Sequence, residues 1–193
     1  MAELQLDPKK TALVLIDLQN AIVGMNPVPH TAAQVVENSR KLAEAFRAQG
    51  APVVYVRVDL NDFLKHPVDQ PPNLGDKPLP AAASEIAPSA GFQPGDILLT
   101  KRHWGAFAGT DLEHQLKTRG IDTVVLTGIS TNVGVESTAR QAHEAGFHVT
   151  LATDAMTDMN LDAHTNSITR IFPRLAETGT TAEILATLNA TKA

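Results

Sequence analysis

The chain has 193 residues, of which 43% are hydrophobic and 19% are charged. This composition is typical of a globular protein, and it excludes a disordered chain or a fibrous repeat. The 16 Lys and Arg residues against 21 Asp and Glu argue against a nucleic-acid surface, because phosphate binding needs a concentrated basic stripe. The length predicts a single domain over residues 1–193, and no apolar run reaches the ~18 residues of a membrane span.

The chain contains no cysteine. Disulfides, thiolate metal ligands and a thiol nucleophile are therefore all excluded, and a hydrolase with this sequence must work without sulfur. The first residues lack the basic start and the small-residue cleavage site of a signal peptide, which predicts a cytoplasmic protein.

Apolar runs of strand length alternate along the chain with segments in which apolar residues recur at helical spacing. The apolar runs predict six strands, at residues 11–17, 52–58, 96–101, 122–129, 147–155 and 174–178. Apolar positions at helical spacing predict helices at residues 31–49, 110–120, 133–145 and 161–171, and a terminal helix from 180. Capping boxes begin at Thr31, Thr110 and Thr180, and Asn160 precedes the fourth helix as a cap. This alternation predicts an α/β domain with a parallel sheet and right-handed crossovers.

Residues 61–95 interrupt the alternation, since they hold seven prolines and few periodic apolar positions. We expect a long surface excursion with at most one short helix near residues 82–87. Loops of this length inside a compact domain are often lids or partner contacts. The alternative is an insertion that has no functional role.

Two charged residues end predicted strands. Asp17 closes the first strand and Lys101 closes the third. Ligands of open parallel sheets bind at the carboxyl ends of the strands, and an Asp and a Lys that converge there would support each other's charged form. The two residues together predict a site. The alternatives are an Asp that braces a loop and a Lys that extends along the sheet edge to solvent.

The segment from Gly128 to Gly134 joins the fourth strand to a helix through Ile, Ser, Thr, Asn and Val. Backbone amides at a helix start suit an oxyanion or a carboxylate. The phosphate-loop and dinucleotide-binding glycine patterns are both missing from this segment. An ordinary helix cap by Asn132 is the alternative interpretation.

Three segments in order resemble the isochorismatase-like (cysteine hydrolase) superfamily: ALVLIDLQNAI, LLTKRHWGAFAGTDL and VVLTGISTNVGVESTAR. The resemblance implies a three-layer α/β/α fold with a six-stranded parallel sheet in the order 3-2-1-4-5-6, and a homo-oligomer, either a dimer or a tetramer. It implies a catalytic set at Asp17, Lys101 and position 134, and a cis peptide bond between Ile129 and Ser130. We expect contacts to a small-molecule substrate from Gln19, Trp104, Phe107, Ile129, Ser130 and Asn132.

Position 134 departs from the amidases of this superfamily, in which a cysteine attacks the substrate. Gly134 occupies the position here, and neither Ser130 nor Ser137 aligns with the nucleophile. Glycine at this position resembles the true isochorismatases, which hydrolyse a vinyl ether without a covalent nucleophile. That likeness implies that Asp17 acts as an acid and that water captures the resulting cation. Without a side chain at 134, we expect a space about the size of a thiol between Asp17, Lys101 and the helix start.

The metal-binding members carry an Asp-x-His pattern after the second strand. The corresponding residues are Asp59-Leu-Asn-Asp62, with His66 the nearest histidine, and the pattern is broken. We therefore predict no catalytic metal and no cofactor. Two functions remain: a cofactor-independent hydrolase of a small organic molecule, favoured by the retained Asp17 and Lys101, and a catalytically silent binding or scaffold protein, favoured by the missing thiol.

Overall fold

The computed structural model describes residues 4–63, 66–71, 75 and 77–190 of the chain. Six parallel strands form one sheet in the order β3-β2-β1-β4-β5-β6, which confirms the implied topology. The strands are β1 (Thr11–Ile16), β2 (Val53–Val58), β3 (Ile97–Lys101), β4 (Thr123–Ile129), β5 (His148–Thr157) and β6 (Glu177–Gly179). The strand order reverses between β1 and β4, so the carboxyl ends of these two strands form the switch point of the sheet.

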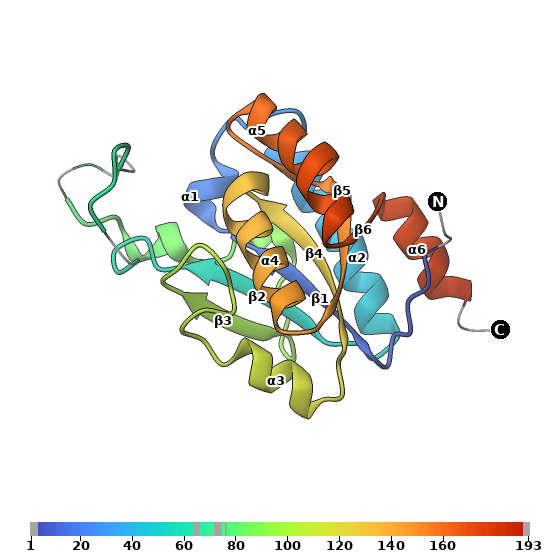
Figure 1. Ribbon diagram of the computed structural model, residues 1–193. Coiled ribbons are helices and arrows are strands. Elements are labelled where there is room, and N and C mark those ends of the chain that lie inside the picture. Colours follow the sequence, from blue (N-terminus) through green and yellow to red (C-terminus); the bar gives the residue numbers. More distant parts are fainter. Residues whose placement is uncertain (1–3, 64–65, 72–74, 76, 191–193) are drawn as a thin grey trace.

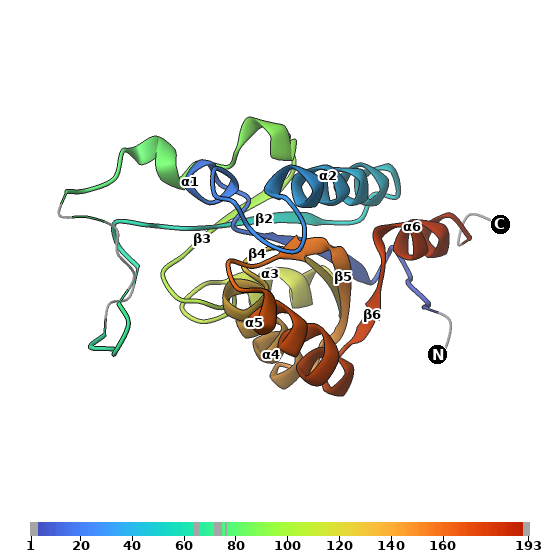
Figure 2. The same ribbon diagram turned by 90° about the horizontal axis from the view of Figure 1, so that it is seen from above.

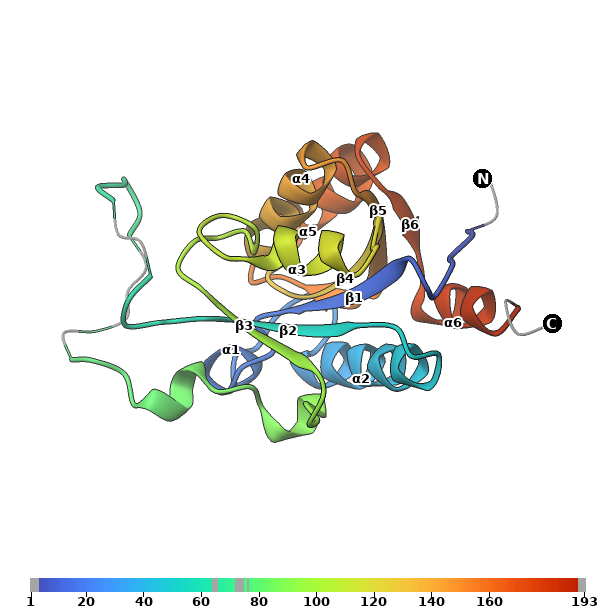
Figure 3. The ribbon, with the colours of Figure 1, turned by 90° about the horizontal axis from the view of Figure 1, so that it is seen from below.

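Helices cover both faces of the sheet (Figures 2 and 3). One face carries α1 (Asn20–Val23), α2 (Ala32–Ala48) and α6 (Thr181–Ala190), and the other carries α3 (Leu112–Thr118), α4 (Glu136–Glu144) and α5 (Leu161–Asn166). Short turns complete the chain: 3-10 turns η1 (Ala81–Ser84), η2 (Pro88–Ala90) and η5 (Phe172–Arg174), and π-helical turns η3 (Thr131–Val135) and η4 (Ser167–Ile171).

The alternating side chains of β1 separate two hydrophobic cores. Leu13 and Leu15 belong to the core beneath α2 and α6, and Val14 and Ile16 belong to the core beneath α3 and α4. All six residues of β1 are buried, as its unbroken apolar run predicts for a strand covered on both faces. The strand therefore delivers its next residue, Asp17, to the buried centre of the sheet's carboxyl edge.

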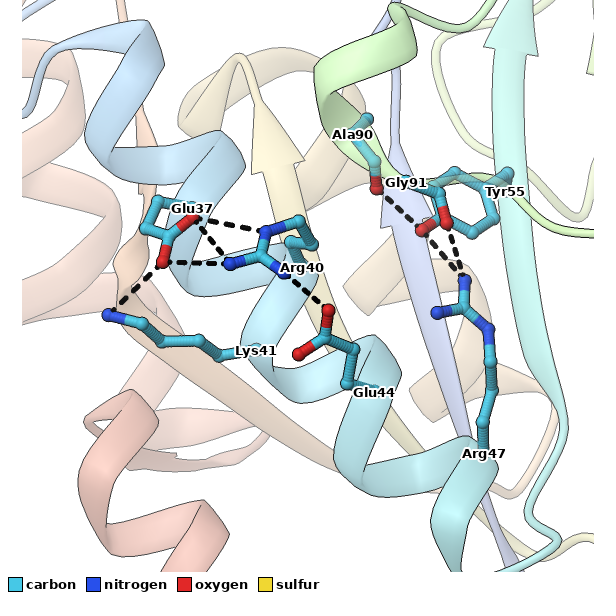
Figure 4. A network of polar contacts seen from close by, with 8 residues as sticks. All are labelled: Glu37, Arg40, Lys41, Glu44, Arg47, Tyr55, Ala90 and Gly91. Carbon is cyan, nitrogen blue, oxygen red and sulfur yellow. Dashed lines mark hydrogen bonds and ion pairs between the residues drawn. The ribbon is translucent and has the colours of Figure 1, made fainter.

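Helix α2 is tied to the chain that precedes β3 by a partly buried polar network (Figure 4). The Tyr55 hydroxyl donates to the Ala90 carbonyl at 2.7 Å, and Arg47 Nη2 donates to the Gly91 carbonyl at 2.8 Å. Arg47 also pairs with Asp96 at 2.7 Å. On the exposed side of the same helix, Glu37, Arg40, Lys41 and Glu44 form a ladder of ion pairs.

Three of the four predicted helix caps are confirmed. Thr31 and Gln34 form a reciprocal capping box, Thr180 and Glu183 form another, and Asn160 Oδ1 accepts the Ala163 amide at 3.0 Å. The prediction at Thr110 is wrong. Its hydroxyl donates to the Ala106 carbonyl at 2.6 Å, so it folds back on the preceding loop, and α3 begins only at Leu112.

Two strand boundaries also differ from the prediction by more than one residue. The last strand begins at Glu177 rather than 174, because the amides of Leu175 and Ala176 both still donate to the Phe172 carbonyl and hold the chain in a turn. Strand β5 continues to Thr157, two residues beyond the predicted end, because its last residues pair with Gly128 and Ile129 after a shift in register. The carboxylate that follows β5 is therefore Asp158.

Part of the predicted excursion at residues 61–95, namely 64–65, 72–74 and 76, lies outside the described residues. The described part projects away from the sheet beyond the carboxyl end of β2 (Figure 1). The Asn61 side chain closes the base of the projection through two hydrogen bonds to the Leu79 backbone, each of 2.9 Å. Instead of one short helix near 82–87, the chain forms η1 and η2. Among the described residues, no helix is long and apolar enough to cross a membrane.

Candidate active site

The site is built around Asp17, which turns the chain sharply out of the sheet. Its φ of 54° lies in the left-handed region, which Asp tolerates better than most residues. Its amide still donates to the Val56 carbonyl of β2 at 2.8 Å. The carboxyl group is therefore held in a buried position at the strand-order switch, although the chain leaves the sheet at this residue.

Lys101 reaches Asp17 across the carboxyl end of β2. Its Nζ lies 2.9 Å from Asp17 Oδ2, and the side chains are only 2% and 7% exposed. Nζ also donates to the His103 carbonyl at 3.1 Å. The predicted convergence of the two charges is therefore present as a buried ion pair.

The two oxygens of the Asp17 carboxyl group differ. Oδ2 faces Lys101, whereas Oδ1 is buried and has no hydrogen-bond partner among the described protein atoms. Burial raises the pKa of Asp17, although Lys101 opposes the shift through its charge and its hydrogen bond. The site thus contains a carboxyl group that holds a proton more readily than usual and has one oxygen unused by the described protein.

Gly134 lies directly against this carboxyl group. A Cβ atom at Gly134 would lie 3.1 Å from Asp17 Oδ2 and 3.7 Å from the Trp104 carbonyl oxygen. The same atom would lie 2.9 Å from Ile16 Cγ2, which is closer than real Cβ contacts. The expected thiol-sized space is therefore wrong, because the Ile16 methyl group and the Asp17 carboxylate pack against the glycine.

The turn between β4 and α4 begins with the expected cis bond between Ile129 and Ser130. The Ser130 carbonyl accepts the amides of Val133 and Val135 at 3.3 and 3.1 Å, which makes the first turn of the helix π-helical. The Asn132 amide donates to Asp158 Oδ2 at 2.8 Å. This amide is consequently used within the protein and is not free for a ligand, although the sequence suggested that amides at this helix start suit an oxyanion or a carboxylate.

Gly128 allows β4 to approach β1 at this point. Its φ is +125°, and a Cβ atom there would lie 2.1 Å from the Ile16 carbonyl oxygen. A side chain at 128 would push the turn away from Asp17. The glycine therefore sets how closely the two strands meet at the site.

Of the other predicted contact residues, Ser130 and Asn132 lie partly exposed in the turn beside Gly134, and Ile129 is buried in the core. The Gln19 side chain is fully buried, and its amide group hydrogen-bonds the Val58 amide and carbonyl at 2.8 and 3.1 Å. It joins the ends of β1 and β2, so its polar atoms serve the fold.

The two aromatic residues that follow Lys101, Trp104 and Phe107, have different surroundings. Trp104 is 66% exposed, while its carbonyl oxygen lies near Gly134. The ring of Phe107 packs 5.6 Å from the ring of Phe147, against the core beneath α3 and α4. Substrate contact by any of these residues stays a prediction.

The sequence interpretation missed Thr131, Asp158 and His164, which lie behind the turn. Asp158 follows β5 as Asp17 follows β1, and the strand-end signal would have found it had β5 been extended to Thr157. His164 shows no sequence signal, because its partner is a threonine 33 residues away. The described residues contain no group of three or more His, Asp and Glu side chains placed to hold a metal ion.

The chain is thus an α/β protein with a parallel sheet, and its buried Asp–Lys pair lies at the strand-order switch, where open α/β sheets bind their ligands. The family model "Isochorismatase domain" matches residues 11–183, and the chain belongs to the isochorismatase family. The isochorismatase-like superfamily consists of hydrolases.

Relatives match along nearly the whole chain. The isochorismatase family protein YecD of Escherichia coli O157:H7 is 50% identical over 189 residues, covering 96% of this chain and 100% of that protein. YwoC of Bacillus subtilis is 45% identical over 188 residues, covering 96% and 97%. The solved structure of an isochorismatase family protein from Burkholderia thailandensis has a TM-score of 0.90 at 45% identity, covering 96% of this chain and 98% of that chain.

Proposed function

We propose that this isochorismatase-family hydrolase cleaves a small organic molecule without a covalent intermediate, by vinyl-ether-type or other water-mediated hydrolysis. The supporting observation is the buried Asp17 carboxyl group, which pairs with Lys101 through Oδ2 and leaves Oδ1 unpartnered by the described protein. The family resemblance implies that a nucleophile would lie at position 134, where this chain has glycine, and the chain has no cysteine.

Protonated Asp17 supplies the acid for this reaction. Its raised pKa keeps the proton on the carboxyl group at a higher pH than usual. Transfer of that proton to the terminal vinyl carbon consumes the C=C electron pair and leaves an oxocarbenium ion. The new Asp17 carboxylate is stabilised by Lys101 at 2.9 Å.

Water then adds to the cation, and the Asp17 carboxylate accepts the proton that the water loses. The resulting hemiketal then breaks its bond to the leaving oxygen. The hydroxyl proton of the hemiketal passes to that oxygen, which departs as an alcohol, and the hydroxyl oxygen becomes the carbonyl of the remaining product. The net reaction consumes one vinyl ether and one water, and Asp17 ends protonated as it began. A positioned acid of this kind contributes about 10²- to 10⁴-fold to the rate.

A silent binding protein is the second candidate. The missing thiol favours it, because the hydrolases of the superfamily that use a cysteine could not work with this sequence. Both candidates place the ligand beside Asp17, but only the hydrolase needs the proton on Asp17.

A panel of vinyl ethers, amides and carbamoyl compounds distinguishes these candidates. We expect turnover of vinyl ethers, with no mass added to the enzyme when it is sampled during turnover. Trp104, the single tryptophan of the chain, reports binding by its fluorescence. Binding without turnover across the panel would establish the silent protein, and a covalent adduct during amide turnover would exclude the proposed mechanism.

A further inference from the structure

A second set of buried polar groups lies behind the turn that carries Gly134. Thr131 Oγ1 and His164 Nδ1 are 2.8 Å apart, and the two residues are 0% and 6% exposed. The next residue of the turn, Asn132, donates its amide to Asp158 Oδ2. Two consecutive residues of the turn are thus fastened to residues 158–164, the segment that runs from the end of β5 into α5.

That segment is itself held from the opposite side by the loop between α1 and α2. Val28 and Asp158 exchange backbone hydrogen bonds of 2.7 and 3.0 Å, and Thr157 Oγ1 donates to the His30 carbonyl at 2.7 Å. The His30 ring meets the His164 ring edge-on, with centroids 6.1 Å apart. The imidazole of His164 is therefore enclosed between the turn and this loop, and it has little freedom to move.

The charge state of His164 follows from these neighbours. Burial lowers its pKa, nearby His30 lowers it further, and the Asp158 carboxylate opposes both. The ring is consequently neutral at neutral pH. A neutral imidazole has one donor and one acceptor nitrogen, and a threonine hydroxyl can pair with either.

We propose that His164 is a positioning residue for the candidate site. Its Nδ1, bonded to Thr131, and Asp158, bonded to the Asn132 amide, fix the start of η3 so that Gly134 stays against the Asp17 carboxyl group. Thr131 lies in η3, which leads into α4, and His164 lies in α5; α4 and α5 cover the same face of the sheet (Figures 1 and 2). The effect on catalysis rests on the proposed function, whereas the effect on the Asp17 environment does not.

The test is the titration of the Asp17 carboxyl group, followed by carbon NMR in the full chain. Thr131→Val and His164→Leu remove the two partners with little change in side-chain volume. We expect each to shift the Asp17 pKa, and the double variant to shift it no further than the single variants, because all three break the same link. His164→Asn keeps a polar atom near the Nδ1 position, and Thr131→Ser keeps the hydroxyl, so these two should retain the wild-type titration. His148→Leu, an exposed histidine at the start of β5, is the matched control.

An unchanged Asp17 titration in folded Thr131→Val and His164→Leu would overturn the proposal. If those variants fail to fold, His164→Asn and His164→Gln replace them. Asn is expected to retain the wild-type pKa and Gln is expected to lose it, and equal titrations would equally overturn the proposal. With a substrate in hand, kcat should fall about 10- to 100-fold in the disrupting variants, because small misplacements of a catalytic group have large effects on rate. If the variants shift the Asp17 pKa but the wild-type protein hydrolyses none of the compounds, the positioning role of His164 is supported. Only the proposed function is then refuted.

Discussion

The chemistry at the residue scale depends on the unequal surroundings of the two Asp17 oxygens. In the proposed mechanism, Lys101 stabilises the carboxylate that forms after proton transfer, while burial favours the protonated form before it. A fully exposed Asp would be ionised at neutral pH and could not donate a proton. The same buried position therefore keeps the proton on Asp17 and places beside it the cation that stabilises the carboxylate.

The pH dependence of turnover follows from the raised pKa of Asp17. Only the protonated form donates, so kcat should fall as the pH rises through that pKa, which lies above the ordinary value of 3.8. Lys101→Met removes the charge that opposes the shift, so the falling limb should move to higher pH. A rate profile over pH in both enzymes checks this, and a limb that moves to lower pH in the variant would contradict it.

At the element scale, the tie between α2 and the chain before β3 should carry measurable stability. Tyr55→Phe removes the hydroxyl that donates to the Ala90 carbonyl and leaves that buried acceptor short of a partner. We expect the free energy of unfolding to fall by about 1–3 kcal/mol, measured by denaturant titration. Lys41→Ala, on the exposed ladder of the same helix, should leave it nearly unchanged, because exposed ion pairs contribute little. Equal losses in the two variants would contradict this account of the network.

Local sequence signals predicted most of the elements correctly. The unbroken apolar run of β1 and the capping box at Thr31 act through neighbouring residues, so the sequence alone carries them. The cap at Thr110 failed for a local reason, because a competing acceptor lies four residues before it, whereas the other errors arose where distant contacts decide. Thr110 bonds back to Ala106, β5 is extended by pairing with β4, and the packing of Ile16 against Gly134 fills the space that a missing side chain suggested.

In the candidate site, too, some features could be predicted from the sequence and others could not. The resemblance to a known family placed Asp17, Lys101 and Gly134 together, and their geometry agrees with that placement. The His164–Thr131 contact could not be predicted, because it joins residues from separate segments that no local pattern relates.

At the scale of the whole molecule, we expect a homo-oligomer, as the family resemblance implies. Four exposed apolar residues lie in the segment before α2 and at the start of α5: Met25, Val28, Met159 and Leu161. The bridge between Val28 and Asp158 brings these segments together. Light scattering should give the mass of a dimer or tetramer, and Val28→Glu combined with Met159→Glu should lower it. A monomeric mass for the wild type at working concentration would contradict the expectation.

The central claim is that the Asp17 proton drives hydrolysis, and the most direct test is the single-turnover rate of a vinyl-ether substrate in Asp17→Asn. The amide keeps the shape of the carboxyl group but has no acidic proton, so the rate should fall about 10²- to 10⁴-fold. Asp122→Asn, at the amino end of β4, is the matched control and should retain the wild-type rate. Wild-type turnover in Asp17→Asn would contradict the account, because the chemistry would then lie elsewhere in the molecule.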